Sequence, residues 1–146
     1  MATIEEVNNY WKQLDIEKVI MDTVEQNAEL MLELNKKQLK EGFDSEGKRL
    51  REYKSSLYAE VKHRMNPVPG FGNPDLYKTG SFFLEFTLRV TGKKKFFMYS
   101  QDDKYYRLVK DYGENIFGLG TDKRTELIDG GFRSDLQNKV KAEVRL

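Results

Sequence analysis

DLYKTGSFFLEF, residues 75–86, is the stretch of this chain that decides the fold. A loop with all three prolines of the sequence leads into it, and after Gly80 large apolar side chains fall on every second residue. Glycine permits a tight turn with positive φ, and a period of two is typical of a half-buried β-strand. The pattern therefore predicts a strand over residues 81–90, with Gly80 turning the chain into it.

The residues after this strand predict a hairpin. Thr91, Gly92 and the lysine run at 93–95 form the expected turn, and residues 96–100 form the returning strand. Residues 104–112 satisfy neither the helical period nor the strand period well. For that segment both a short helix and a further strand stay open.

Helical periodicity dominates the chain before the proline-rich loop. Thr3 and Glu6 have the spacing of a capping box, which predicts a short N-terminal helix. Asp15 is a predicted N-cap for a long helix over residues 15–40, because apolar residues recur there every three or four positions. No glycine or proline interrupts this pattern before Gly42.

The apolar face of the predicted long helix contains two amides, Asn27 and Gln38. A stripe of this kind is typical of a helix packed on a sheet, and also of a helix packed on a neighbouring subunit. Packing in the chain's own core is the simpler interpretation. Contact between subunits is the alternative.

The middle of the chain is rich in turn signals. Residues 42–55 are polar and predict a loop or loose hairpin, and Ser56 predicts the cap of a short helix. Two Asn-Pro pairs in residues 66–75 favour extended or turn geometry. This segment is therefore expected to be an extended arm or an ordered loop.

Helical signals return at the C-terminal end. Thr121 is a predicted N-cap for a helix over residues 122–129, and Gly130 with Gly131 is expected to separate it from a last helix. The predicted fold class is α+β: a long N-terminal helix packed on a small antiparallel sheet with a β-hairpin core, an extended Pro/Gly-rich loop and C-terminal helices. A single domain is expected, with a helical region at 1–41, a loop or arm region at 42–80, a hairpin region at 81–112 and a helical C-terminus at 113–146.

Composition bounds the class of protein. The 146 residues suit one domain with one hydrophobic core. With 25 basic and 24 acidic side chains the formal charge is +1, so the net charge of the chain does not favour binding to nucleic acid or to an anionic membrane. The absence of cysteine excludes a disulfide scaffold and thiolate chemistry. No run approaches the ~18 apolar residues of a membrane span and no signal-peptide pattern is present, so a soluble cytoplasmic protein is expected.

No catalytic, cofactor or metal site is expected. Residues 42–49 match a Walker A spacing as far as the lysine, but Arg49 stands where the motif needs Ser or Thr, and the run follows a helix. His63, the one histidine, is expected to be a surface or loop-packing side chain because no metal or triad partner is evident. Asp102 and Asp103 are expected to be solvent-exposed polar side chains of a turn. The chain is therefore predicted not to be an enzyme.

Lys93, Lys94 and Lys95 form the strongest basic cluster, and aromatic residues flank it. These residue types neutralise phosphates and stack on bases. A solvated hairpin tip is the simpler interpretation, and lysines near a sheet edge also discourage unwanted strand pairing. A small nucleic-acid-binding module that uses this turn is the alternative function.

Several segments together resemble a known group of proteins. They are QLKEGFDSEGKRLREY at 38–53, the proline-rich loop, DLYKTGSFF at 75–83 and IFGLGTDKRTELIDGGFRSDLQNKV at 116–140. These segments resemble small structural proteins of tailed bacteriophages, of the virion-morphogenesis, tail-completion or head-to-tail connector type, and particularly neck or ring proteins of crAss-like phages. In that group a "DL, TG, aromatic" junction leads into a β-hairpin, and "FGL" precedes a capped helix.

The resemblance implies a structural virion protein without cofactor or small-molecule substrate, made in the bacterial host cytoplasm. It implies a homo-oligomeric ring at the head-to-tail junction, either a neck ring or a tail terminator or completion ring. The implied partners are other copies of the chain and adjacent portal, connector or tail proteins, with no membrane. The residues expected at interfaces are Phe71, Asp75, Leu76, Tyr77, Thr79 and Gly80. Lys93, Lys94 and Lys95 are candidates for contact with DNA in the lumen or with an acidic neighbour.

Overall fold

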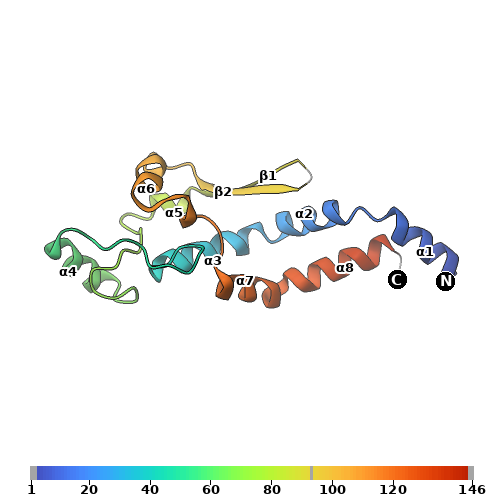
Figure 1. Ribbon diagram of the computed structural model, residues 1–146, viewed down its shortest axis with the longest axis horizontal. Helices are drawn as coiled ribbons and strands as arrows, with labels where there is room; N and C mark the ends of the chain where they lie inside the picture. The colour runs from blue at the N-terminus through green and yellow to red at the C-terminus, as the bar shows by residue number, and fades with distance from the viewer. Residues whose placement is uncertain (1–2, 93, 145–146) are drawn as a thin grey trace.

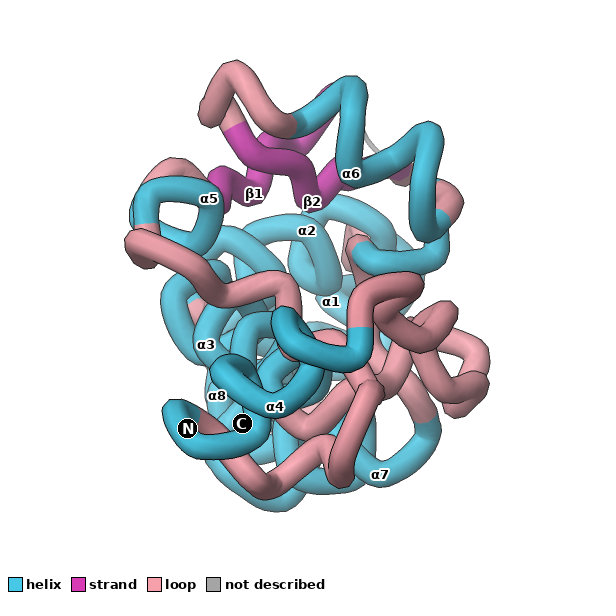
Figure 2. The backbone as a smooth tube through the Cα atoms, turned by 90° about the vertical axis from the view of Figure 1, so that its left-hand side faces the viewer, coloured by secondary structure: helices cyan, strands magenta, loops and turns pink. Residues whose placement is uncertain are grey.

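The computed structural model describes residues 3–92 and 94–144, which form an elongated α+β fold (Figure 1). Its axis consists of two successive helices, α2 and α3. A hairpin and α6 lie on one side of this axis, and α7 and α8 lie on the other (Figures 1 and 2). The elements are α1 (Ile4–Gln13), α2 (Ile16–Gln26), α3 (Ala28–Lys40), α4 (Ser56–Met65), α5 (Ser81–Leu84), β1 (Phe86–Thr91), β2 (Lys95–Ser100), α6 (Tyr105–Tyr112), η1 (Glu114–Ile116), α7 (Thr121–Leu127), η2 (Ile128–Phe132) and α8 (Arg133–Glu143).

Local capping signals fix the start of the first two helices. Thr3 and Glu6 form the predicted capping box, in which each side chain accepts a hydrogen bond from the other residue's backbone N–H. The Asp15 carboxylate accepts from the N–H of Lys18 at 3.2 Å, as its predicted role as N-cap of α2 requires. Both caps satisfy amides that the first turn of a helix leaves without an intrahelical partner.

The helix predicted over residues 15–40 is divided in two at Asn27. The backbone there leaves helical geometry, with φ of −101° and ψ of 12°. The Asn27 amide nitrogen donates to the carbonyl of Thr23 at 2.9 Å and to the carboxylate of Asp135 at 3.0 Å. A buried amide that bonds its own backbone competes with the helical ladder. Asn27 therefore ends α2 and ties it to α8.

The core consists of two neighbouring clusters along the helical axis. One joins the C-terminal half of α3 to α5 and η1 through Leu39, Leu50, Phe82, Phe83, Phe86 and Ile116. The other joins α2 and α3 to α7 through Val24, Met31, Leu34 and Leu127, and the hairpin residues Leu88, Val90 and Met98 pack against it. The face that carries the apolar stripe is thus buried within the chain.

The predicted strand over residues 81–90 is wrong in its first half. Residues 81–84 form the helical turn α5, and β1 begins at Phe86. A strand would place Phe82 and Phe83 on opposite faces, whereas both rings are buried and lie 5.0 and 5.4 Å from the ring of Phe86. The helical turn brings all three rings into one cluster. Gly80 makes the predicted turn, with φ of 86°.

The hairpin itself is confirmed, since β1 and β2 pair antiparallel with Phe86 opposite Ser100. At its base the Ser100 hydroxyl donates to the carbonyl of Phe82 at 2.8 Å, which joins the hairpin to α5. The next segment, which the sequence left open, is the helix α6. Its Tyr105 ring stacks on Phe117 at 5.6 Å.

The C-terminal region departs from one sequence expectation and agrees with another. Thr121 is the first residue of α7, and the N-cap is Gly120. The predicted helix break at Gly130 and Gly131 is confirmed as a kink within η2, the π-helical turn that connects α7 to α8. Gly131 has non-helical backbone angles at this kink, with φ of 141°. None of the helices in the described part of the chain is long and apolar enough to cross a membrane.

Candidate functional site

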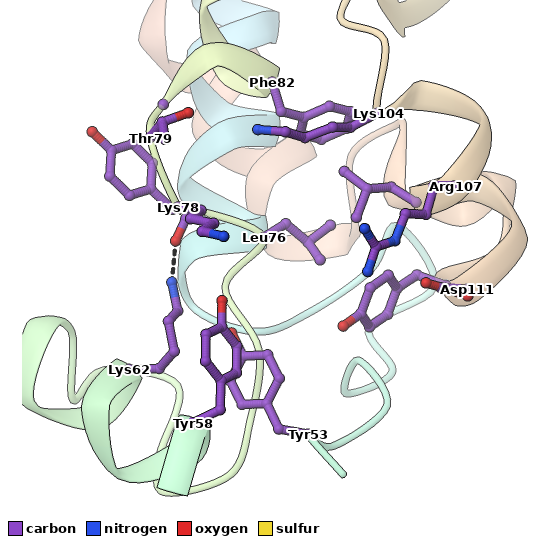
Figure 3. A pocket seen from close by; sticks show the side chains of 14 residues that line it. Tyr53, Tyr58, Lys62, Leu76, Lys78, Thr79, Phe82, Lys104, Arg107 and Asp111 are labelled. Atoms are coloured by element: carbon purple, nitrogen blue, oxygen red, sulfur yellow. Dashed lines mark hydrogen bonds between the residues drawn. The ribbon is translucent and has the colours of Figure 1, made fainter. Parts of the chain in front are cut away.

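A pocket of about 490 Å³ lies beside residues 76–80, where α4, the end of the proline-rich loop and α6 meet (Figure 3). Aromatic and cationic side chains dominate its wall. The lining residues are Tyr53, Tyr58, Lys62, Leu76, Tyr77, Lys78, Thr79, Gly80, Phe82, Lys104, Arg107, Leu108, Asp111 and Tyr112. We call this the tyrosine-lysine pocket.

A buried ion pair fixes the wall that the proline-rich loop contributes. The Lys62 ammonium lies 2.7 Å from the Asp75 carboxylate, and both side chains are almost fully buried. Lys62 also donates to the carbonyl of Tyr77, as the dashed line in Figure 3 shows. The same carboxylate accepts from the Tyr77 N–H at 3.0 Å and from the Asn66 amide at 3.1 Å. These bonds lock the end of the loop onto α4.

Helix α4 carries Lys62 on its buried face, where Lys62 meets the end of the proline-rich loop. Its N-cap is Ser55, whose hydroxyl accepts from the Tyr58 N–H at 3.2 Å, and not the predicted Ser56. Lys62 and Ala59 form the buried face of α4. Within the loop the carbonyl of Pro69 accepts from Arg49 at 2.9 Å and from Asn73 at 2.7 Å.

The backbone of residues 76–80 is tightly constrained. Leu76 has φ of 56°, the one positive value among the described non-glycine residues. A Cβ at Gly80 would lie 3.0 Å from the hydroxyl oxygen of Tyr77, with φ there at 86°. The Tyr77 ring in turn stacks on Phe83 at 5.7 Å, and the Lys40 ammonium lies 5.2 Å from the Tyr77 ring centre. Contacts of Tyr77 with Phe83 and Lys40 therefore hold residues 76–80 against the rest of the protein.

Uncompensated positive charge collects in the pocket. Lys78 and Arg107 have no carboxylate at ion-pair distance among residues 3–92 and 94–144. Lys104 donates to the Ser81 hydroxyl at 3.1 Å. Asp111, the one acidic residue of the wall, lies 4.0 Å from Arg51. The pocket therefore presents a net positive surface to a ligand.

Two tyrosines of the pocket are kept in the neutral form. Burial raises the pKa of Tyr53, and the nearby charge of Asp75 raises it further. Burial also raises the pKa of Tyr112. A phenol with the ordinary pKa of 10.0 is already protonated at neutral pH, and the raised pKa values extend the protonated form to more alkaline pH, so each hydroxyl can donate a hydrogen bond.

The structure brings four of the six predicted interface residues together at this pocket: Leu76, Tyr77, Thr79 and Gly80. Tyr77 and Thr79 are exposed there. Asp75 lies in the interior as the partner of Lys62. Phe71 lies outside the pocket and is exposed, and the centre of its ring lies 5.8 Å from the centre of the His63 ring in an edge-to-face arrangement.

The lysine turn lies apart from this site. Lys93 lies outside the described residues. Lys94 forms an ion pair of 3.0 Å with Glu17 of α2, and Lys95 is exposed at the start of β2. The charge of Lys94 is thus offset within the chain.

The other sequence candidates have structural roles. In the Walker-like loop the Asp44 carboxylate accepts from the N–H groups of Glu46 and Lys48, both at 2.9 Å, so these amides do not point at a ligand. Asp102 accepts from the Lys104 N–H at 2.8 Å, which lowers the pKa of Asp102. No group of three or more His, Cys, Asp or Glu side chains in the described part of the chain could hold a metal ion.

Sequence reasoning did not predict the partners of two buried amides of α3, which hold residues 116–120 against this helix. Asn35 donates to the carbonyl of Ile116 at 2.9 Å and accepts from the Gly118 N–H at 3.1 Å. Gln38 donates to the carbonyl of Gly118 at 3.0 Å and accepts from the Gly120 N–H at 2.7 Å. Gln38, an amide within the apolar stripe, was the available signal, because a buried amide needs polar partners; Asn35 was not part of that stripe.

Comparison with models of protein families, with curated proteins and with solved structures finds no significant match for this chain.

Proposed function

We propose that this chain is a non-catalytic structural protein of a tailed-bacteriophage virion. Its proposed place is the head-to-tail connector, as a subunit of a neck ring or of a tail terminator or completion ring. The proposal joins the resemblance of the four sequence segments to an observation on the surface of the molecule, the apolar face of α4.

The apolar face of α4 carries the proposal. Leu57, Val61 and Met65 are spaced by four residues and therefore share one face of the helix, and they are 76%, 53% and 61% exposed. The chain's own core contacts the opposite face, at Ala59 and Lys62. Grouped exposed apolar side chains on a protein mark sites of protein contact.

The place of α4 in the molecule suits a contact between neighbours. This helix lies at one end of the elongated fold, and α1 lies at the other (Figure 1). When a surface at one end meets a different surface of the next copy, the contact is heterologous, and such contacts close into rings when the rotation allows it. The shape and the exposed face together support a ring-forming subunit.

The alternative, a nucleic-acid-binding module that uses the lysine turn, finds less support. Lys94 is paired with Glu17, and the formal charge of the chain is +1. Nucleic-acid binding generally needs an extended basic surface.

Sedimentation velocity tests the proposal, on the chain alone and coexpressed with the products of neighbouring genes. The double variant Val61→Glu, Met65→Glu is expected to reduce assembly without loss of helical circular dichroism, because both side chains are exposed. Glu60→Gln is the matched control on the same helix, since Glu60 contacts Arg64 on its polar side. A chain that stays monomeric under all conditions, or a double variant that assembles like the wild type, would contradict the proposal.

A further inference from the structure

We infer that the tyrosine-lysine pocket binds an acidic peptide segment of a neighbouring protein, with carboxylates at Lys78, Lys104 and Arg107 and an apolar side chain against the aromatic floor. The inference rests on the proposed assembly role, because that role supplies the neighbour. It adds the chemistry of the partner and a site separate from the apolar face of α4.

The arrangement of the charges indicates an anionic ligand. Figure 3 shows Lys78 and Arg107 reaching the pocket from opposite sides, with Leu76 between them and the rings of Tyr53 and Tyr58 below. Neither cation has an acidic partner within the described chain. A concave surface of one charge concentrates ligands of the opposite charge, and arginine can hold a carboxylate through two parallel hydrogen bonds.

The uncharged part of the wall indicates a peptide. Leu76, Phe82 and Leu108 supply apolar surface, and the tyrosines supply rings with polar ends. Tyrosine and arginine are enriched at the energetic centres of protein interfaces. The volume of about 490 Å³ falls within the 300–1,000 Å³ that is usual for binding pockets. The pocket can therefore take an apolar side chain and the acidic residues beside it.

The wall disfavours a nucleic acid as ligand. Lys78, Lys104 and Arg107 line a single pocket, whereas binding along a nucleic-acid strand needs a groove that tracks many phosphates. The wall also combines cations with apolar side chains, which suits alternating acidic and apolar residues.

The site is preformed, which favours binding. The ion pair of Lys62 with Asp75 fixes one wall, and the stacking of Tyr105 on Phe117 holds α6 at the other. A pocket whose walls are already ordered loses less conformational entropy when a ligand binds. The ligand thus orders only its own segment and the exposed cationic side chains.

Fluorescence anisotropy with a labelled hexapeptide of alternating glutamate and leucine tests the inference. A peptide with glutamine in place of glutamate is the control ligand. We expect the glutamine peptide to bind at least about tenfold more weakly. The variant Lys78→Glu, Arg107→Glu should weaken binding of the glutamate peptide by about tenfold or more. Lys141→Glu, in the last turn of α8 and remote from the pocket, should leave it unchanged because salt screens distant charges.

Three results would overturn the inference: no binding of the glutamate peptide, equal binding of both peptides, or tighter binding of a single-stranded oligothymidine. The last would assign the pocket to nucleic acid. The measurement is repeated on the Val61→Glu, Met65→Glu variant. Peptide binding that survives there while assembly is lost supports both proposals. Failure of the peptide to bind while wild-type assembly persists rejects only the pocket.

Discussion

Lys62 and Asp75 form an ion pair of 2.7 Å in which the lysine side chain is 7% exposed and the aspartate side chain 4%. Most other ion pairs among the described residues lie at the surface. Two opposite charges lose much hydration energy when they are buried, so such a pair adds little net stability but becomes costly when one partner is lost. Its role here is to fix where the end of the proline-rich loop lies on α4.

The first prediction concerns this pair. Lys62→Met should lower the free energy of unfolding by about 3–5 kcal/mol, because it leaves the Asp75 charge buried without its cation. The double variant Lys62→Met, Asp75→Asn should recover much of the loss, since the neutral amide can still accept from the Tyr77 N–H. A urea-denaturation double-mutant cycle measures this. Strictly additive losses would contradict the coupling.

The second prediction concerns the turn at Gly80. Gly80→Ala should destabilise the fold through the left-handed backbone and also through the contact with Tyr77. Gly92→Ala is the matched control, because φ there is 66° and a Cβ would meet no atom within 4 Å. We expect a loss of roughly 1–2 kcal/mol for Gly92→Ala and a larger one for Gly80→Ala. Thermal unfolding compares them, and equal losses would exclude a role for the Tyr77 contact.

The third prediction concerns the amides of α3. Asn35→Leu leaves the carbonyl of Ile116 and the N–H of Gly118 without their partner. The expected loss in unfolding free energy is about 1–3 kcal/mol for each buried group. Glu29→Gln on the same helix is exposed and should change the stability by less than about 0.5 kcal/mol. Chemical denaturation distinguishes the two, and a stable Asn35→Leu protein would contradict the assigned role.

The fourth prediction concerns the contact between α3 and α7. Lys123 of α7 lies 3.1 Å from Glu41 and 3.3 Å from Glu126. The hydrogen bond from Lys123 lowers the pKa of Glu126 below its ordinary value of 4.5. Burial opposes the charge of Lys123, but the hydrogen bonds to both glutamates raise the pKa of this lysine above its ordinary value.

Because the pKa of Glu126 is lower in the folded chain, its contribution to stability is present above pH 4.5 and is lost as the pH falls through the folded value. The raised pKa of Lys123 acts on the alkaline side, where its contribution is lost above the folded value. Glu126→Gln should therefore flatten the fall in melting temperature as the pH drops below 4.5. An unchanged acid slope in this variant would show that other carboxylates determine it.

Features that depend on neighbours in sequence were predictable. The capping box at Thr3, the cap at Asp15, the hairpin and the positive φ of Gly80 all follow from residue type and short spacing. Each involves a hydrogen bond or backbone preference within a few residues, which the sequence displays directly.

Features that depend on distant partners were not predictable. The alternation after Gly80 favours a strand, but packing of Phe82 and Phe83 in one cluster selects a helical turn. Asn27 ends α2 partly because Asp135 accepts its amide from more than a hundred residues away. The pocket was missed because α6 brings Arg107 to the loop only in the folded chain. Local periodicity in the sequence does not reveal any of these distant partners.

The bonds from Asn35 and Gln38 to residues 116–120 have a consequence for the order of folding. They close a loop of about eighty residues, and α2 likewise finds its packing partner in α8 near the chain's end. Such distant contacts form slowly, because the entropy of loop closure is lost before any contact compensates it. During synthesis, α2 and α3 must therefore leave the ribosome with their buried faces still uncovered, and the helical axis is completed only after the last third of the chain has emerged.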